Sequence, residues 1–225
     1  MTGEDLPMNE GGAMENYRKI DYAHNKDVVL RYIPGHFITP SSHVSDFMDL
    51  IDMKSRQREA RETAKEIAEQ YYATTVVDTI LCLENMEVVG AYLAEALTEA
   101  GVLSKNAHKT IYVARPEFNS AGQIIFRQNT LHMVMNKNVL LLAATVTTGS
   151  SLEHAINGIQ YFGGKVIGVS SIFSAVREAG GMPVSALFTE KDLPEYASYS
   201  PAECPMCKAR VPVDAICNGY GLSSL

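Results

Sequence analysis

Residues 139–151 constrain the fold of this chain more than any other segment. The segment opens with four large apolar residues, Val139-Leu140-Leu141-Leu142, and two alanines, a pattern typical of a parallel strand that is buried on both faces. Small and hydroxylated residues follow at 147–151, and an amphipathic pattern begins at Ser151 or Leu152. The sequence therefore predicts a strand, a tight loop and a helix in immediate succession.

A junction of this kind is suited to binding phosphate. Backbone N–H groups at the start of the helix point at a bound anion, and side-chain hydroxyls add donors. The alternative is a hydroxyl-rich helix cap, because Ser and Thr are common caps. One cap needs one hydroxyl, so the run of five favours a phosphate site. The candidate phosphate-binding residues are Thr145, Thr147, Thr148, Gly149, Ser150 and Ser151.

Strand and helix patterns alternate along the chain. Helical patterns cover residues 55–72, 87–100 and the segment after Leu152, and strand patterns cover 75–83, 109–114, 165–173 and 184–189. This alternation predicts an α/β fold with a parallel central sheet flanked by helices. Ligands of such sheets bind beyond the carboxyl ends of the strands. The junctions after Leu83, Ala114 and Ala144 therefore form the candidate site.

Length and composition narrow the class of protein. The 225 residues suit a single domain over 19–225, preceded by a flexible tail over 1–18. A net charge of −7 without a dense Lys/Arg run argues against nucleic-acid binding. No apolar run approaches the ~20 residues of a membrane helix, and the acidic start does not resemble a signal peptide. We expect a cytoplasmic protein that has no membrane partner.

These landmarks together resemble the type I phosphoribosyltransferases, and among them the orotate phosphoribosyltransferases. The family motif is an apolar strand, two adjacent acidic residues, an apolar pair, and then T-T-G with a small residue. Residues 147–151 match its 5′-phosphate loop, whereas Ala143 and Ala144 occupy the places of the acidic pair. In the family those carboxylates hold the ribose hydroxyls. The resemblance implies a small hood, formed by residues of about 28–50 and the C-terminal tail.

The resemblance also implies an activity. A glycosyltransferase of this family transfers ribose 5-phosphate from phosphoribosyl pyrophosphate (PRPP) to a pyrimidine-type base and releases pyrophosphate, with Mg²⁺ as the expected cofactor and a homodimer as the expected assembly. The two alanines leave open an alternative, a non-catalytic sensor or regulatory protein that binds PRPP or a nucleoside monophosphate. The sequence contains no G-x-S-x-G, G-x-G-x-x-G or Walker lysine motif that would indicate another α/β enzyme.

Two further junctions carry charged residues. The loop with Glu84, Asn85 and Glu87 corresponds to the family's pyrophosphate loop. Its acids either replace the lost metal and diol contacts or serve as favourable charges in the first turn of a helix. The resemblance assigns Arg115 and Arg127 to catalysis as the cations that address pyrophosphate, since guanidinium groups bind phosphate oxygens in pairs. The alternative for both is a solvated surface arginine.

The two ends of the domain supply the remaining candidates. Ser41, Ser42 and His43 loosely match a stretch that covers the pyrimidine in the family, and the alternative is a turn around a structural histidine. Cys204 and Cys207 form a C-x-x-C pair, which is half of a zinc site. Cys217 and a histidine could complete it, although no H-x-x-x-H pair is present. The alternative is a pair of reduced thiols.

Overall fold

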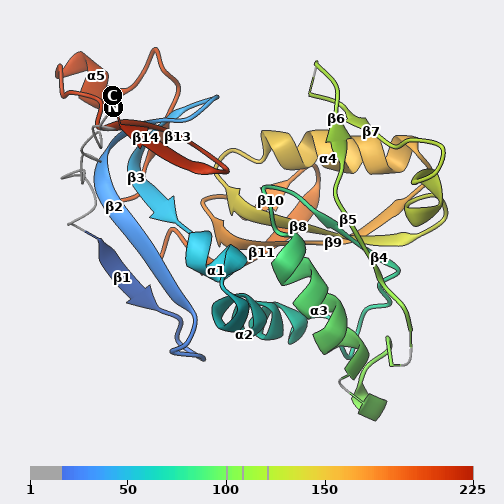
Figure 1. The fold of residues 1–225 in the computed structure, drawn as a ribbon. Coiled ribbons are helices and arrows are strands. Elements are labelled where there is room, and N and C mark those ends of the chain that lie inside the picture. Colours follow the sequence, from blue (N-terminus) through green and yellow to red (C-terminus); the bar gives the residue numbers. More distant parts are fainter. Residues whose placement is uncertain (1–16, 100, 108, 121, 225) are drawn as a thin grey trace, which may run out of the picture.

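The computed structural model describes residues 17–99, 101–107, 109–120 and 122–224. Two six-stranded sheets dominate the described residues, a central one sandwiched between helices and a second one that packs at one end of it (Figure 1). Most of the tail expected over 1–18 lies outside the described residues. Arg18, its last residue, begins the strand β1 (Arg18–Asp21), which pairs with β2.

The central sheet has the strand order β10-β11-β9-β8-β4-β5. Five of its strands are parallel, and the short β10 is antiparallel to β11. The strands are β4 (Thr79–Cys82), β5 (Tyr112–Ala114), β8 (Asn138–Val146), β9 (Lys165–Ser174), β10 (Glu178–Ala179) and β11 (Met182–Thr189). The apolar run of β8 lies in the middle and is buried on both faces, as the sequence predicts.

Helices cover both faces of this sheet. Helices α2 (Gln57–Ala68) and α3 (Glu87–Glu99) lie on one face and α4 (Ser150–Tyr161) on the other (Figure 1). Alternate residues of β8 serve the two cores: Leu140 and Leu142 pack toward α2 and α3, while Leu141 packs toward α4. A register slip of one residue would exchange these faces, so the packing fixes how the loop after β8 is presented.

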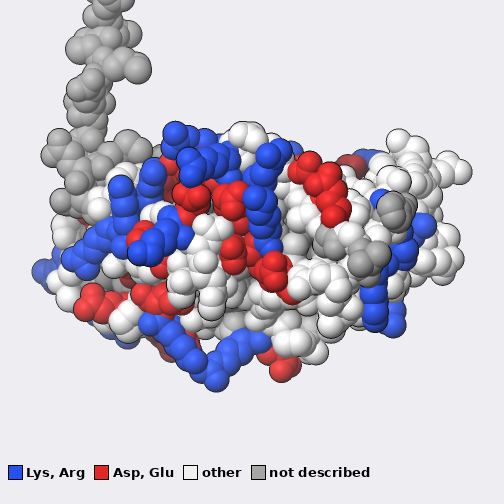
Figure 2. Space-filling view, turned by 90° about the horizontal axis from the view of Figure 1, so that it is seen from below, with Lys and Arg blue, Asp and Glu red and all other residues white. Residues whose placement is uncertain are grey.

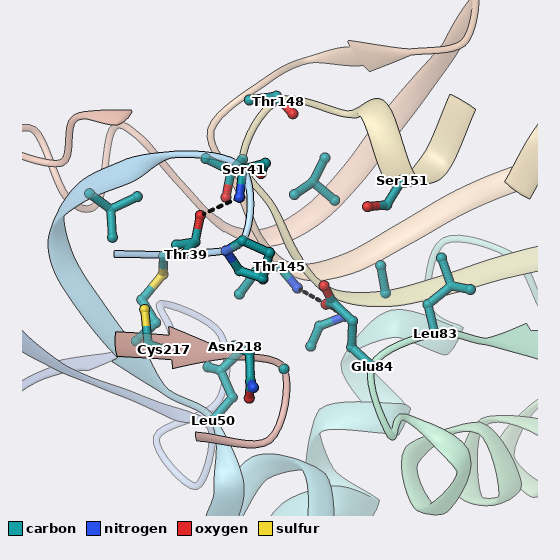
Figure 3. Close-up of a pocket in the computed structure, with 18 of the residues that line it drawn as sticks. Thr39, Ser41, Leu50, Leu83, Glu84, Thr145, Thr148, Ser151, Cys217 and Asn218 are labelled. Atoms are coloured by element: carbon teal, nitrogen blue, oxygen red, sulfur yellow. Dashed lines mark hydrogen bonds between the residues drawn. The ribbon is translucent and has the colours of Figure 1, made fainter. Parts of the chain in front are cut away.

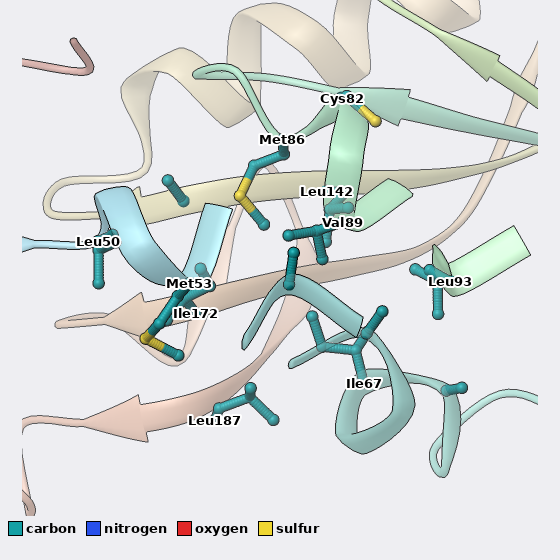
Figure 4. Packing of buried hydrophobic residues seen from close by; sticks show 14 of the residues in the cluster. Leu50, Met53, Ile67, Cys82, Met86, Val89, Leu93, Leu142, Ile172 and Leu187 are labelled. Atoms are coloured by element: carbon teal, nitrogen blue, oxygen red, sulfur yellow. The ribbon is translucent and has the colours of Figure 1, made fainter. Parts of the chain in front are cut away.

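The second sheet, which we call the hood, combines strands from the N-terminal and C-terminal parts of the chain. Its strand order is β12-β3-β2-β13-β14, and β1 also pairs with β2. Its strands after β1 are β2 (Val29–Ile38), β3 (His43–Asp49), β12 (Ser198–Tyr199), β13 (Ala215–Asn218) and β14 (Gly221–Ser224). The short helix α1 (Ile51–Ser55) connects it to α2. Leu50 and Met53 reach into the core cluster of Ile67 and Leu142 (Figure 4), which anchors the hood to the central sheet.

Short elements complete the fold. A two-stranded hairpin, β6 (Glu117–Phe118) and β7 (Ile124–Ile125), follows β5, and the single turn α5 (Pro205–Lys208) precedes β13. On the face that carries α2 and α3, basic and acidic side chains are interspersed (Figure 2). Ion pairs such as Arg56–Glu59 and Lys65–Glu62 run along α2 there. Within the described residues, each helix is too short or too polar to cross a membrane.

Candidate functional site

A pocket of about 490 Å³ lies between the hood and the carboxyl edge of the central sheet. The hood contributes the turn at 39–41, the end of β3 and the β13–β14 hairpin, and the core contributes Glu84 and the loop between β8 and α4. Figure 3 shows Ser41 on one side of this space and Thr148 and Ser151 on another, with Glu84 below. The sheet edge predicted to bind ligands is therefore one wall of this pocket.

The loop between β8 and α4 presents donors to this pocket. Gly149 ends it with φ of 83°, and a Cβ atom there would lie 2.8 Å from Cβ of Ala179, so the position requires glycine. Four N–H groups at the start of α4 find no acceptor within the described part of the chain; they belong to Thr148, Gly149, Ser151 and Leu152. Helix starts leave such donors unpaired, and this one directs them at a pocket lined with hydroxyls. The geometry suits an anion.

The side chain of Glu84, which follows β4, reaches the end of β8, where the sequence has alanines in place of acids. Its backbone adopts φ of 53°, and the next residue, Asn85, has φ of 62°, a region that residues other than glycine rarely visit. This tight turn sends the side chain across to β8. There its Oε2 accepts hydrogen bonds from the N–H groups of Ala144 (3.1 Å) and Thr145 (2.9 Å), as Figure 3 shows for Thr145. A carboxylate thus lies beside Ala144.

The surroundings of Glu84 disfavour its charge. The carboxyl group lines the pocket and its side chain is open to solvent there. Partial desolvation by the surrounding protein raises its pKa, while the Thr145 N–H, the charge of Lys54 and the Ala144 N–H oppose that rise. Lys54 is itself buried, and its Nζ donates to the carbonyl oxygens of Gly219 (2.9 Å) and Glu84 (3.3 Å). Burial lowers the pKa of Lys54, and Glu84 raises it. One ammonium group therefore connects α1, the Glu84 loop and the β13–β14 hairpin.

The two candidate arginines lie at different distances from the pocket. Arg115 lines an adjoining hollow that it shares with Glu84, Asn85 and Tyr220. Its Nη2 donates to the hydroxyl of Tyr220 at 3.4 Å, and its Nε lies 3.6 Å from Oε1 of Glu87.

Arg127, in contrast, forms a two-point ion pair with Glu117, with Nε 2.8 Å from Oε2, and it does not line the described pocket. Glu87 is likewise absent from the pocket lining. The structure therefore brings Arg115 to the edge of the site, whereas Arg127 follows the β6–β7 hairpin and pairs with Glu117 on it.

The hood candidates separate in the same way. Ser41 lines the pocket, and its N–H faces Oγ1 of Thr39 at 3.4 Å. Ser42 is buried and contacts Thr39 through its Oγ. His43, expected over the base, does not line the pocket, and its Nδ1 lies 3.3 Å from Sγ of Cys207.

The candidate zinc cysteines do not all lie together. Cys204 and Cys207 lie beside His43 and outside the pocket, whereas Cys217, considered as a third zinc ligand, lines the pocket and stands apart from them.

Comparisons with known proteins agree with this architecture. No family model matches the chain. Orotate phosphoribosyltransferase of Chlorobaculum parvum is 26% identical over 184 residues, which cover 81% of this chain and 87% of the relative. The Thermus thermophilus enzyme is 26% identical over 189 residues, covering 82% and 93%. The structure of Aeropyrum pernix orotate phosphoribosyltransferase matches with a TM-score of 0.50 at 16% identity, over 73% of this chain and 90% of that one. The chain resembles the orotate phosphoribosyltransferases.

The fold of the type I phosphoribosyltransferases, expected from the sequence, is thus confirmed, and so is the resemblance. The sequence analysis did not single out several polar residues of the pocket, and three of them are Lys54, Asp46 and Tyr196. Burial raises the pKa of Asp46, which accepts a hydrogen bond from Ser45, and the Tyr196 hydroxyl lies 3.4 Å from Oγ1 of Thr147. None of the three belongs to a local motif. Only the packing of the hood brings them to the loop.

Proposed function

We propose that this chain transfers ribose 5-phosphate from PRPP to a pyrimidine-type base and releases pyrophosphate. The observation that carries the proposal is the carboxylate of Glu84, hydrogen-bonded to the N–H groups of Ala144 and Thr145. It stands at the end of β8, where the family motif has acids and this chain has alanines. Glu84 would supply from a neighbouring loop the oxygen ligands for the ribose hydroxyls.

The remaining groups of the pocket fit the parts of PRPP. The unpaired N–H groups and hydroxyls of residues 147–151 would hold the 5′-phosphate. Arg115 and Lys54 are the cations on the side of the pyrophosphate, and Ser41 would lie over the base. The base nitrogen forms a bond to C1 of the ribose and loses its proton, and the bond from C1 to pyrophosphate breaks with both electrons leaving on oxygen. The protein would orient the two reactants and stabilise the charge that develops in the transition state.

The residues present also fit Mg²⁺. The ion prefers oxygen ligands and is commonly bound through one or two carboxylates together with substrate phosphates. Glu84 provides such a carboxylate at the pocket, beside the loop that would hold the phosphate. Bound Mg²⁺ would neutralise charge on the leaving pyrophosphate.

A second candidate function rests on Ala143 and Ala144. Both are buried, with 2% and 3% exposure, and neither can hold a sugar hydroxyl. A protein that senses PRPP or a nucleoside monophosphate needs the phosphate loop but not the contacts to the reacting sugar. The two functions differ in their requirement for metal, so one binding experiment separates them.

The experiment is a calorimetric titration with PRPP, first in Mg²⁺ and then in EDTA, followed by nucleoside monophosphates alone. Tight binding that requires Mg²⁺ supports the transferase, and binding that is indifferent to metal supports the sensor. Thr148→Val removes one hydroxyl from the loop and should weaken PRPP binding about 10-fold or more. Thr110→Val, at an exposed site outside the pocket, is the matched control. No binding of either ligand would contradict both functions.

A further inference from the structure

Four ligand-type side chains converge behind the pocket, at the far side of the hood. His36 lies on β2, His43 on β3, Cys204 just before α5 and Cys207 within α5. Their donor atoms all lie within 4.8 Å of one another. The side chains of His36, His43 and Cys204 are buried, and Cys207 lies at the surface. The C-x-x-C pair of the sequence thus finds its partners in two histidines that are about 160 residues away along the chain.

Four of the six separations among these donor atoms match those of tetrahedral zinc ligands. Nε2 of His36 lies 3.6 Å from Sγ of Cys204 and 3.5 Å from Sγ of Cys207, and Nδ1 of His43 lies 3.3 Å from Sγ of Cys207. The two imidazole nitrogens are 3.2 Å apart. Zinc bond lengths of about 2.3 Å to sulfur and about 2.05 Å to nitrogen place tetrahedral ligands about 3.5 Å apart for N···S and about 3.3 Å for N···N. All four separations agree with these values within 0.3 Å.

Hydrogen bonding alone does not account for this arrangement. Nδ1 of His36 lies 3.1 Å from the carbonyl oxygen of Val211, a pure acceptor, so the proton of this imidazole is on Nδ1 and Nε2 carries a lone pair. Three groups crowd around that single lone pair: His43, Cys204 and Cys207. One in-plane lone pair accepts one good hydrogen bond, whereas a metal ion on it explains all three contacts. A histidine that ligates a metal typically donates its other N–H to an oxygen in this way.

We propose that His36, His43, Cys204 and Cys207 bind one zinc ion in a closed, structural site. Two thiolates and two imidazoles in a tetrahedron are the ligand set of structural zinc. Four protein ligands leave no position for substrate, so this metal is separate from the Mg²⁺ of the proposed transfer reaction. The inference stands independently of the proposed function.

The site has a consequence for the pocket. Zinc would clamp the hairpin of β2 and β3 to the segment around α5, which leads directly into β13 and β14. Asp214 already fixes this junction, because its Oδ2 accepts a hydrogen bond from the backbone N–H of His36 at 2.7 Å. Asn218 and Tyr220, beyond it, line the pocket. The metal would thus hold one wall of the substrate site in place from behind.

The test is the metal content of the protein purified without chelators under reducing conditions. We expect one equivalent of zinc per chain by mass spectrometric elemental analysis. The double variant Cys204→Ser/Cys207→Ser should lose it at least tenfold. Cys217→Ser, which alters a buried hood cysteine outside the set, should retain the full equivalent. Loss of zinc from the Cys217 variant but not from the double variant would overturn the assignment.

A second measurement does not depend on a variant that folds. Wild-type protein stripped of metal and reduced is titrated with Co²⁺, which reports tetrahedral thiolate ligation through its visible and charge-transfer absorption. We expect saturation at one equivalent, displacement of the spectrum by zinc, and a melting temperature that rises on metal addition. Less than a tenth of an equivalent of zinc as purified, together with no cobalt spectrum, would refute the site.

Discussion

Replacing Glu84 by Gln isolates what its charge contributes. Glutamine has nearly the same shape and keeps an oxygen that can accept the hydrogen bonds from the Ala144 and Thr145 N–H groups. The variant therefore preserves the turn at Glu84 and removes the negative charge from the pocket. If Glu84 takes the place of the missing acids, removing its charge should weaken the binding of PRPP.

The size of the loss follows from the contacts that a sugar or metal would make. A hydrogen bond to a charged group contributes about 1.5–3 kcal/mol. At about 1.4 kcal/mol per factor of ten, removing the charge should weaken PRPP binding about 10- to 150-fold. Nucleoside monophosphates held by the phosphate loop alone should lose less.

The same substitution should not lower the thermal stability of the protein, although it weakens PRPP binding. Burial raises the pKa of Glu84 above its ordinary value of 4.5, so the folded protein holds this proton more tightly than the unfolded chain does. That stabilising effect is complete below pH 4.5 and is lost as the pH rises through the folded-state pKa. The uncharged glutamine side chain of the variant escapes the loss. The variant should match the wild type in acid and equal or exceed its melting temperature at neutral pH.

The assay pairs calorimetric PRPP affinity with thermal unfolding measured from pH 4 to pH 8. Glu95→Gln, at an exposed position on α3, controls for a general change of charge. Unchanged PRPP affinity together with lower stability at neutral pH would refute the reasoning, because Glu84 would then only support the loop.

Three further substitutions follow from the same geometry. Lys54→Met removes two charged hydrogen bonds, to the carbonyl oxygens of Gly219 and Glu84. Urea denaturation should show a free energy of unfolding that is lower by roughly 1–3 kcal/mol, because relief of the buried charge offsets part of the loss. Gly149→Ala forces a side chain into φ of 83° and against Ala179, and should cost about 1–3 kcal/mol and weaken PRPP binding, whereas unaltered stability and affinity would count against the loop geometry. Ala144→Asp places a buried carboxyl group beside that of Glu84; by thermal unfolding it should destabilise the protein by roughly 2 kcal/mol or more rather than improve PRPP binding.

The sequence predicts the central sheet well because its signals are local. The apolar run of β8, the glycine at 149 and the amphipathic helix after it each constrain a few neighbouring residues, and the resulting junction fixes where the pocket lies. Helix α2 is shorter than the pattern over 55–72 suggests, since the chain leaves the helix at Ala68 and turns toward β4.

The site depends on contacts that no local pattern encodes. Glu84 reaches β8 because two consecutive residues without glycine adopt positive φ, which the residue types do not announce. His36 and the C-x-x-C pair meet only because β13 returns to pair with β2. The sequence leaves open whether Glu84 and Glu87 replace the acids missing at Ala143 and Ala144, and the structure brings the carboxyl group of Glu84 to the N–H of Ala144. The spacing of residues along the sequence does not predict which of these distant residues come into contact.

We propose that this pocket performs the transfer reaction as well as binding its substrate. The release of pyrophosphate from PRPP by wild-type protein in Mg²⁺, with and without orotate and other pyrimidine-type bases, tests this. We expect release that requires both a base and Mg²⁺, together with formation of the corresponding nucleoside monophosphate. Saturable PRPP binding without release in the presence of any of these bases would contradict it and would leave a PRPP-binding protein with the fold of the enzyme.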